Sequence, residues 1–196
     1  MLDAKFFLWP YPGVDLNEAI NKISPMLQKS ALGIYIDDPS IGGNLAEYIA
    51  LVCRNWNINP AWVMVSAQRE QSTLTTPAAD FKRSARAAWL GFVGQDVGRT
   101  TKPGYYGVYT QVERCCEQTA WLHGTEANGK WPPYLRAAKE SRRFYPGVSL
   151  NIERNGSPVK YYPKDAGEYV QLKYTPHWAV LDTNESIAEK FGLLNT

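Results

Sequence analysis

The division between apolar and polar positions is clearest in the stretch NPAWVMVSAQREQS, residues 59–72. Asn59 is a good N-cap, because its side-chain oxygen accepts from the free N–H groups of a first helical turn, and Pro60 suits the first helical position. Residues 61–67 are apolar except for Ser66, whereas residues 68–71 are all polar. This pattern predicts a helix that is buried at its start and polar at its end, with Glu70 in its last turn.

Helical periodicity and stop signals predict further helices on both sides of this buried helix. A helix should begin at Asp15 and run to about residue 27, with Pro25 kinking or ending it. Asn44 caps an amphipathic stripe that extends to residue 56, and Gly124 ends a helix that begins after Gly107. The remaining helices are expected at residues 81–89, 134–145, 166–180 with an interruption at Pro176, and 185–193.

Two segments break the helical pattern. Asn155-Gly156 lies between two strand-like runs, which is the strongest short-range signal for a β-hairpin. Residues 1–13 contain two prolines and a glycine, so we expect an extended aromatic arm that packs on a surface. Together these patterns predict a mainly α fold of the α+β class, built as one domain over residues 1–196 around the buried helix, with a small β-hairpin.

Composition narrows the function more by exclusion than by assignment. A formal net charge of +2 gives no electrostatic reason to bind nucleic acid. Three cysteines without metal-ligand spacing predict reduced thiols and no metal or other cofactor, and two histidines far apart in sequence give no triad. Aromatic residues make up 13% of the chain, including seven Trp and twelve Tyr. Large cores use such residues, and so do sugar-binding grooves.

The apolar runs are too short for a membrane span, and the N-terminal MLDAKFFLWPYPG lacks the charge pattern and length of a signal peptide. We therefore expect a chain without a membrane span that is made in the cytoplasm. We also expect it to be a monomer.

Glu70 is the main candidate for chemistry. A carboxyl group in partly apolar surroundings holds its proton more readily than one in water, which suits a general acid. A glutamate beside an arginine and two glutamines is, on its own, more often a solvated helix end. The choice between these interpretations depends on the other motifs in the chain.

Three features occur in one order: the buried helix that ends in Glu70, the segment GYYGVYTQ at residues 104–111, and the late KYTPHW that contains Tyr174. This order resembles the lysozyme-like superfamily, and more narrowly the soluble lytic transglycosylases and goose-type lysozymes. In those proteins a helix of the form NPxxxxAxxxxES carries the catalytic glutamate. Here Gln71 separates Glu70 from Ser72, whereas the transglycosylases have serine directly after glutamate. The resemblance covers about residues 45–180.

The resemblance implies a lysozyme-like helical domain that cleaves the MurNAc–GlcNAc β-1,4 bond of peptidoglycan, as a muramidase or a lytic transglycosylase. It implies Glu70 as the catalytic acid. The residues it implies for substrate binding are Ser72, Tyr105, Tyr106, Gly107, Gln111 and Tyr174. Because no signal peptide is expected, the chain is similar to a bacteriophage endolysin released by a holin, or to a virion-associated lysin, acting on the bacterial cell wall.

The sequence leaves two alternatives for the group that attacks the anomeric carbon. Hydrolysis of the ordinary type needs a second carboxylate, at about 5 Å for retention or roughly 6.5–9.5 Å for inversion. Asp80 and Asp96 are the candidates, although both also suit turn and cap positions. Without a second carboxylate, the substrate's acetamido group or muramyl 6-hydroxyl would act instead. A chitinase-type glycosidase and a non-catalytic cell-wall glycan-binding module are the alternative functions.

Overall fold

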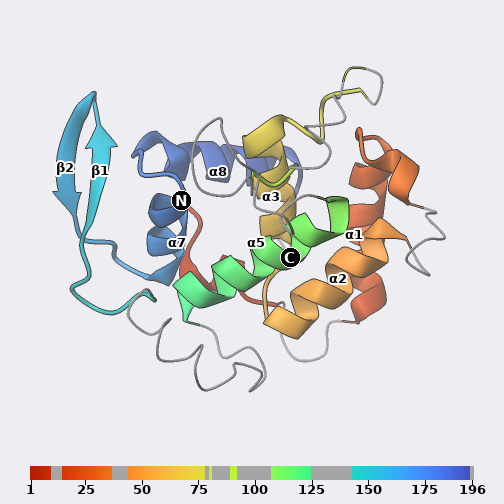
Figure 1. Cartoon of the computed structure of the whole chain (residues 1–196), viewed down its shortest axis with the longest axis horizontal. Helices are drawn as coiled ribbons and strands as arrows, with labels where there is room; N and C mark the ends of the chain where they lie inside the picture. Colours follow the sequence, from red (N-terminus) through yellow and green to blue (C-terminus); the bar gives the residue numbers. More distant parts are fainter. Residues whose placement is uncertain are drawn as a thin grey trace.

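The computed structural model describes residues 1–9, 15–36, 44–77, 80, 89–91, 107–124 and 143–194. These residues form a mainly helical structure with one two-stranded antiparallel sheet (Figure 1). The predicted mainly α fold with a small hairpin is therefore confirmed.

Helix α3 (Pro60–Gln71) lies among the other helices, and its residues 60–67 are all buried. The Asn59 side chain accepts from the Ala61 N–H at 2.9 Å, and Pro60 occupies the first turn, as predicted. Trp62 is fully buried, packs on Phe7 with 4.6 Å between ring centroids, and donates from Nε1 to Thr119 Oγ1 at 2.9 Å. Removing a core tryptophan of this kind costs about 3–5 kcal/mol. The N-terminal part of the helix that carries Glu70 is thus held in the core.

Helices α1 (Leu16–Gln28) and α2 (Leu45–Trp56) pack on each other and on α3. The side chains of Asp15 and Asn44 cap them, as predicted. Pro25 does not end α1, which continues to residue 28 because the last turn carries Leu27, a fully buried core residue. Burial in the core here outweighs the hydrogen bond that proline removes.

Helix α5 (Val108–His123) begins after Gly107 and ends before Gly124, as predicted. Both glycines have positive φ, 129° and 82°, which favours glycine over residues with a side chain. Cys115 and Cys116 are buried on this helix, and α5 packs against α2, α3 and the later helix α7 (Ala166–Tyr174).

The predicted hairpin is confirmed. Strands β1 (Leu150–Arg154) and β2 (Ser157–Tyr161) pair antiparallel, and Asn155 and Gly156 form the turn with φ of 53° and 77°. Positive φ at both turn residues gives a twist that matches the strands, which is why Asn-Gly favours this turn. The Glu153 N–H also donates to the Pro176 carbonyl at 2.7 Å, so β1 is attached to the segment after α7.

The interruption predicted at Pro176 is observed, whereas the gap predicted at residues 181–184 is not. Helix α7 ends at Tyr174, and α8 spans Ala179–Lys190, so the break falls at residues 175–178 and residues 181–184 are helical. Thr175 is extended, as expected for a residue before proline, and residues 176–178 bond to β1 in place of continuing the helix. Asn184, which lies where a loop was expected, is fully buried.

The N-terminal arm differs from the prediction in two ways. Ala4–Phe7 forms a short 3₁₀ helix, η1, capped by Asp3, so this part is not extended. Leu2 and Phe7 belong to the core and do not merely cover a surface. η1 contacts α3 and α7, so the apolar side chains of Leu2 and Phe7 are removed from water by packing against these helices. Residues 10–13 of the arm lie outside the described residues.

Two more predicted helices fall wholly or mainly on segments that the structure does not describe. These are residues 81–88 and residues 134–142; residues 143–145, which follow, are not helical. Among the helices that are described, none has the length and apolar character needed to cross a membrane.

Candidate active site

Three helices meet at one short segment, Leu90–Gly91. Gln111 on α5 accepts from the Leu90 N–H through Oε1 at 3.3 Å, and the Tyr174 hydroxyl at the end of α7 donates to the Leu90 carbonyl at 3.0 Å. Gly91 lies against Glu70 of α3, because a Cβ in its place would be 2.7 Å from Glu70 Oε2. Residues that are 20 to 84 positions away from Leu90 in the chain are thus held around one two-residue segment.

Trp89 fixes the start of this segment. It is fully buried and donates from Nε1 to the Val108 carbonyl at 2.8 Å, in the first turn of α5. Gly91 has a φ of 79°, a conformation in which a side chain is strained. Both its conformation and its contact with Glu70 therefore require glycine.

Glu70 is in the last turn of α3, and its side chain is 25% exposed. The predicted half-buried position is therefore observed. Its surroundings are more polar than expected, because the neighbouring Arg69 pairs with it. Arg69 Nε donates to Oε1 at 2.9 Å. Nη2 lies 2.8 Å from the same oxygen but without the direction of a hydrogen bond, so it contributes only through its charge.

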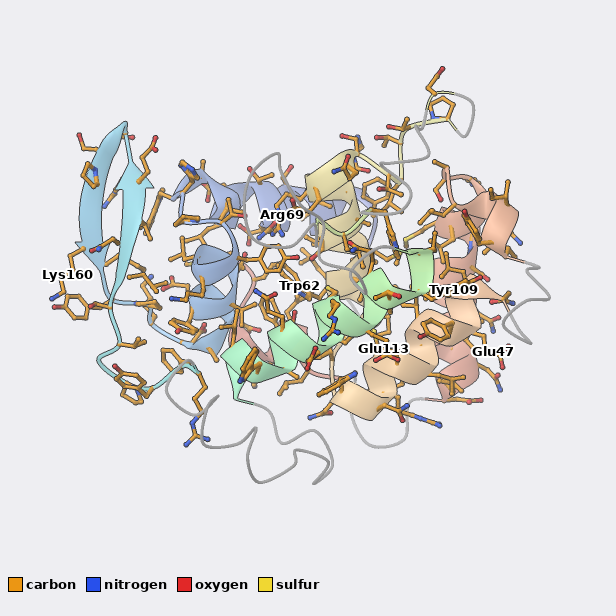
Figure 2. The ribbon with its side chains drawn as sticks, viewed as in Figure 1. Glu47, Trp62, Arg69, Tyr109, Glu113 and Lys160 are labelled. Atoms are coloured by element: carbon orange, nitrogen blue, oxygen red, sulfur yellow. The ribbon has the colours of Figure 1, made fainter. Side chains whose placement is uncertain are left out.

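Arg69 is itself 8% exposed, which is unusual for an arginine at a helix end. Its guanidinium carbon lies 4.9 Å from the ring centroid of Tyr174 and 5.4 Å from that of Trp62, so the cation contacts two aromatic faces. Nη1 donates to Asn184 Oδ1 at 3.2 Å. Figure 2 shows Arg69 and Trp62 close together on α3. These contacts leave the guanidinium little freedom, so it holds Oε1 and leaves Oε2 beside Gly91.

A buried amide pair continues this network away from the surface. Asn184 Nδ2 donates to Gln171 Oε1 at 3.0 Å, and Gln171 Nε2 donates to the Leu2 carbonyl at 3.0 Å. Both amides are fully buried. Arg69 is thereby positioned by α8, α7 and the N-terminal segment together.

Tyr174 is a neutral hydrogen-bond donor in this site. Burial raises the pKa of its hydroxyl well above the ordinary value; the Cys115 thiol and Glu70 add to the shift, and Arg69 opposes it. The hydroxyl keeps its proton and uses it on the Leu90 carbonyl. Tyr174 therefore supports the segment beside Glu70 and stacks under Arg69.

The residues that the resemblance assigned to substrate binding have different surroundings. Gln111 is fully buried and holds Leu90, and Gly107 caps α5 with its carbonyl accepting from the Gln111 N–H. Ser72 is exposed at the end of α3 with a φ of 51°, and its carbonyl accepts from the backbone N–H groups of Thr75 and Thr76. Tyr105 and Tyr106 lie outside the described residues.

Neither of the two candidate second carboxylates is found beside Glu70 among the described residues. Asp80 is exposed, with its backbone N–H bonded to the Pro77 carbonyl at 3.0 Å, which is a turn position. Asp96 lies outside the described residues. Within the described part of the chain, no group of three or more His, Cys, Asp or Glu side chains could hold a metal ion.

A hollow of about 270 Å³ lies at the hairpin, on other elements than those that carry Glu70. Its lining comes from β1, the hairpin turn, β2 and the segment after α7: Asn151, Ile152, Glu153, Gly156, Pro158, Pro176 and His177. Glu153 Oε2 lies 3.4 Å from His177 Nδ1 on its wall, and both side chains are about half exposed. The hollow is therefore separate from the cluster around Glu70.

Sequence reasoning identified Glu70, Gln111 and Tyr174 but missed Arg69, Gly91 and Asn184. The only local feature of the sequence that indicates a role for Arg69 is its position directly beside the glutamate, at the end of an apolar helix. Gly91 and Asn184 lie in segments without a motif, so no local pattern indicated them.

Comparisons of the chain with protein-family models, with curated protein sequences and with solved structures found no match.

Proposed function

We propose that this chain is a lysozyme-like enzyme that cleaves the glycan strand of peptidoglycan, with Glu70 as the general acid. The observation that carries the proposal is the convergence at Leu90–Gly91. The glutamate of the first motif, the glutamine of the second and the tyrosine of the third all contact this one segment. The resemblance implies that these three motifs lie close together in space. Their spacing along the chain does not by itself bring them together.

The geometry of Glu70 suits proton donation. A protonated carboxyl group has one carbonyl oxygen that accepts and one O–H that donates. Arg69 donates to Oε1, so the proton would be carried on Oε2, the oxygen beside Gly91. Oε2–H then protonates the leaving oxygen of the glycosidic bond, and the carboxylate left behind remains paired with Arg69.

Two routes can complete the reaction. In the first, a second carboxylate activates water or attacks the anomeric carbon, and Asp80 and Asp96 remain the candidates for it. In the second, the muramyl 6-hydroxyl attacks and an anhydro end is formed, with Glu70 taking the proton back as a base. The exposed turn position of Asp80 offers no particular support for the first route.

The substrate implies the place of action. We propose that the chain is made in the cytoplasm and meets the cell wall after release by a holin or as part of a virion.

The proposal is tested by incubating the intact protein with purified bacterial cell walls and analysing released muropeptides by mass spectrometry. We expect soluble disaccharide peptides. Hydrolysed ends indicate a muramidase, and ends lighter by one water indicate a lytic transglycosylase. Binding to walls without any released fragment would overturn the proposal in favour of a glycan-binding module. Cleavage of chitin oligosaccharides but not of walls would overturn it in favour of a chitinase.

Gly91→Ala should impair wall cleavage more than its effect on stability explains. The added methyl group would lie 2.7 Å from Oε2 and 3.0 Å from Cδ of Glu70, so the carboxyl group must shift. Misplacing a reacting group by about 1 Å can cost on the order of 100-fold in rate, so we expect at least about a tenfold loss. The measurement is the initial rate of turbidity loss of a wall suspension.

Gly147→Ala is the matched control. Gly147 also has a positive φ, 87°, but a Cβ there meets nothing within 4 Å. Both variants should lose about 1–2 kcal/mol of stability from the strained backbone. Equal rates of lysis by the two variants, both folded, would show that the contact between Gly91 and Glu70 has no catalytic importance.

A further inference from the structure

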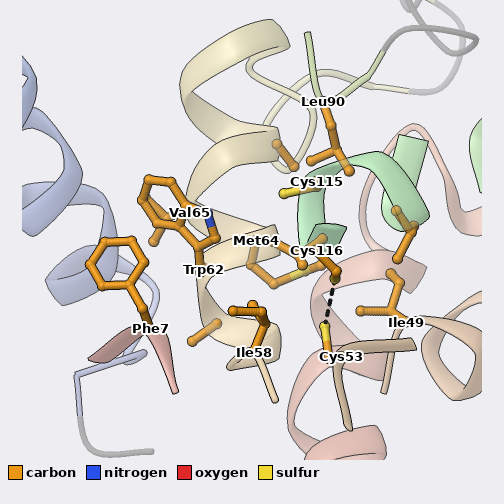
Figure 3. Close-up of a cluster of buried hydrophobic side chains, with 14 of the residues drawn as sticks. Phe7, Ile49, Cys53, Ile58, Trp62, Met64, Val65, Leu90, Cys115 and Cys116 are labelled. Carbon is orange, nitrogen blue, oxygen red and sulfur yellow. Dashed lines mark hydrogen bonds between the residues drawn. The ribbon is translucent and has the colours of Figure 1, made fainter. Parts of the chain in front are cut away.

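Two buried thiols from different helices lie in contact. Cys53 on α2 and Cys116 on α5 have their sulfur atoms 3.5 Å apart, and both side chains are fully buried (Figure 3). A disulfide bond is about 2.05 Å long, so the sulfurs must approach by only about 1.5 Å to bond. The packing of α2 on α5 already brings the two side chains together.

The third thiol has other neighbours. The side chain of Cys115 leaves α5 in a different direction from that of Cys116, because successive residues of a helix are rotated by about 100° around its axis. The Cys115 thiol lies beside Ser66 and Thr119, whereas the Cys116 thiol contacts that of Cys53. Adjacent cysteines rarely bridge without strain, so Cys115 is unsuited to pair with Cys116. The structure thus selects one pair among three thiols.

The same burial that aligns the pair also makes it slow to react. Burial raises the pKa of the Cys116 thiol well above its ordinary value, and the contact with Cys53 and the charge of Glu113 raise it further. Glu113 is held nearby by hydrogen bonds from Tyr48 and Trp56. Since the thiolate is the reacting species, exchange at this pair should be slow at neutral pH while the helices stay packed.

We propose that Cys53 and Cys116 form a disulfide that cross-links α2 to α5 when the protein meets a disulfide oxidant. Each thiol loses its proton, the pair loses two electrons, and a sulfur–sulfur bond forms. The oxidant, a small-molecule disulfide, accepts the two electrons and two protons and is released as two thiols. The pair stays as two thiols in reducing surroundings and becomes cross-linked in oxidising ones.

The bond would close a loop of roughly 60 residues that contains α3 and the segment around Gly91. A loop of this length restricts the unfolded chain strongly, so the oxidised protein should resist unfolding better than the reduced one. This proposal does not depend on glycan cleavage.

The test is to incubate the folded protein with oxidised glutathione at pH 8.5 for several hours, to unfold it in denaturant with an alkylating agent so that every free thiol reacts, and to map peptides by mass spectrometry. We expect the number of alkylated cysteines to fall from three to one, with a peptide that joins Cys53 to Cys116. The urea midpoint of the oxidised protein should rise by about 1–2 M over that of the reduced protein.

Cys115→Ala and Cys53→Ala form a matched pair of single-thiol removals from the same core. Cys115→Ala should still cross-link, and Cys53→Ala should not. Three alkylated cysteines after incubation, or a joined peptide that contains Cys115 without Cys53, would overturn the proposal. Cys115 and Cys116 are adjacent and share one peptide, so fragmentation of the joined peptide from the unmodified sequence identifies the bonded cysteine, even if a variant fails to fold. A bond from Cys53 to Cys115 would also overturn the proposal.

Discussion

Glu70→Gln is expected to abolish the clearing of a cell-wall suspension while the protein stays folded. An amide has no proton acidic enough to transfer to the leaving oxygen, and general acid catalysis contributes about 10²- to 10⁴-fold. The amide oxygen can still accept from Arg69 Nε, so the contact at Oε1 survives the substitution. We therefore expect a rate below about 1% of the unmodified protein, measured as initial turbidity loss.

Glu47→Gln is the control for this experiment, because it makes the same chemical change on an exposed glutamate of α2 (Figure 2). It should lyse walls at the unmodified rate. Circular dichroism of both variants establishes that they are folded. Undiminished lysis by Glu70→Gln would remove Glu70 from the mechanism.

Arg69→Met should be among the most destabilising single substitutions outside the apolar core. It removes two aromatic contacts, the bond to Asn184 and the counter-charge of Glu70. Breaking a buried ion pair costs about 3–5 kcal/mol, and the partial exposure of Glu70 reduces this to about 2–4 kcal/mol. Urea unfolding measures the loss, and wall lysis should fall as well, because Oε1 loses its anchor.

A double-mutant cycle separates the pair from the packing around it. The cycle combines Arg69→Met with Glu70→Gln. Because the amide still accepts from Arg69 Nε, the cycle measures the part of the coupling that depends on the charge of Glu70, for which we expect about 1–3 kcal/mol. Arg69→Lys keeps the charge but lacks the flat guanidinium that contacts Trp62 and Tyr174, so it should recover only part of the loss. Additivity within about 0.5 kcal/mol would mean that the attraction between the two charges does not stabilise the protein.

Local signals in the sequence predicted most of the helices and the hairpin. The cap at Asn59, the glycines that bound α5 and the Asn155-Gly156 turn each act within a few residues, so their effect can be read from the chain. The interruption at Pro176 was predicted, but α8 continues through residues 181–184, where a gap was expected, because Asn184 is held in the core by Arg69 and Gln171. Tertiary contacts decided the boundary there, as they did at Pro25.

The site was predictable only at its motifs. Glu70 is marked by the change from apolar to polar sequence, and a tyrosine at position 174 was indicated by the resemblance. The burial of Arg69 depends on Trp62 within the same helix and on Tyr174 and Asn184, more than a hundred residues away. No window of sequence contains that information. The same holds for Gly91, whose partner Glu70 belongs to another segment.

The buried N-terminal segment has a consequence for how the chain folds. The Leu2 carbonyl accepts from Gln171, the Ala4 carbonyl contacts His123 Nε2 at 2.9 Å, and the backbone at Asp3 lies where a Cβ on Gly167 would be 2.6 Å away. Residues 2–4 thus complete their contacts only after α7, which lies more than 160 positions later in the chain, has been made. Loop closure over such separations is slow, so the core around α3 should close late, after synthesis of most of the chain.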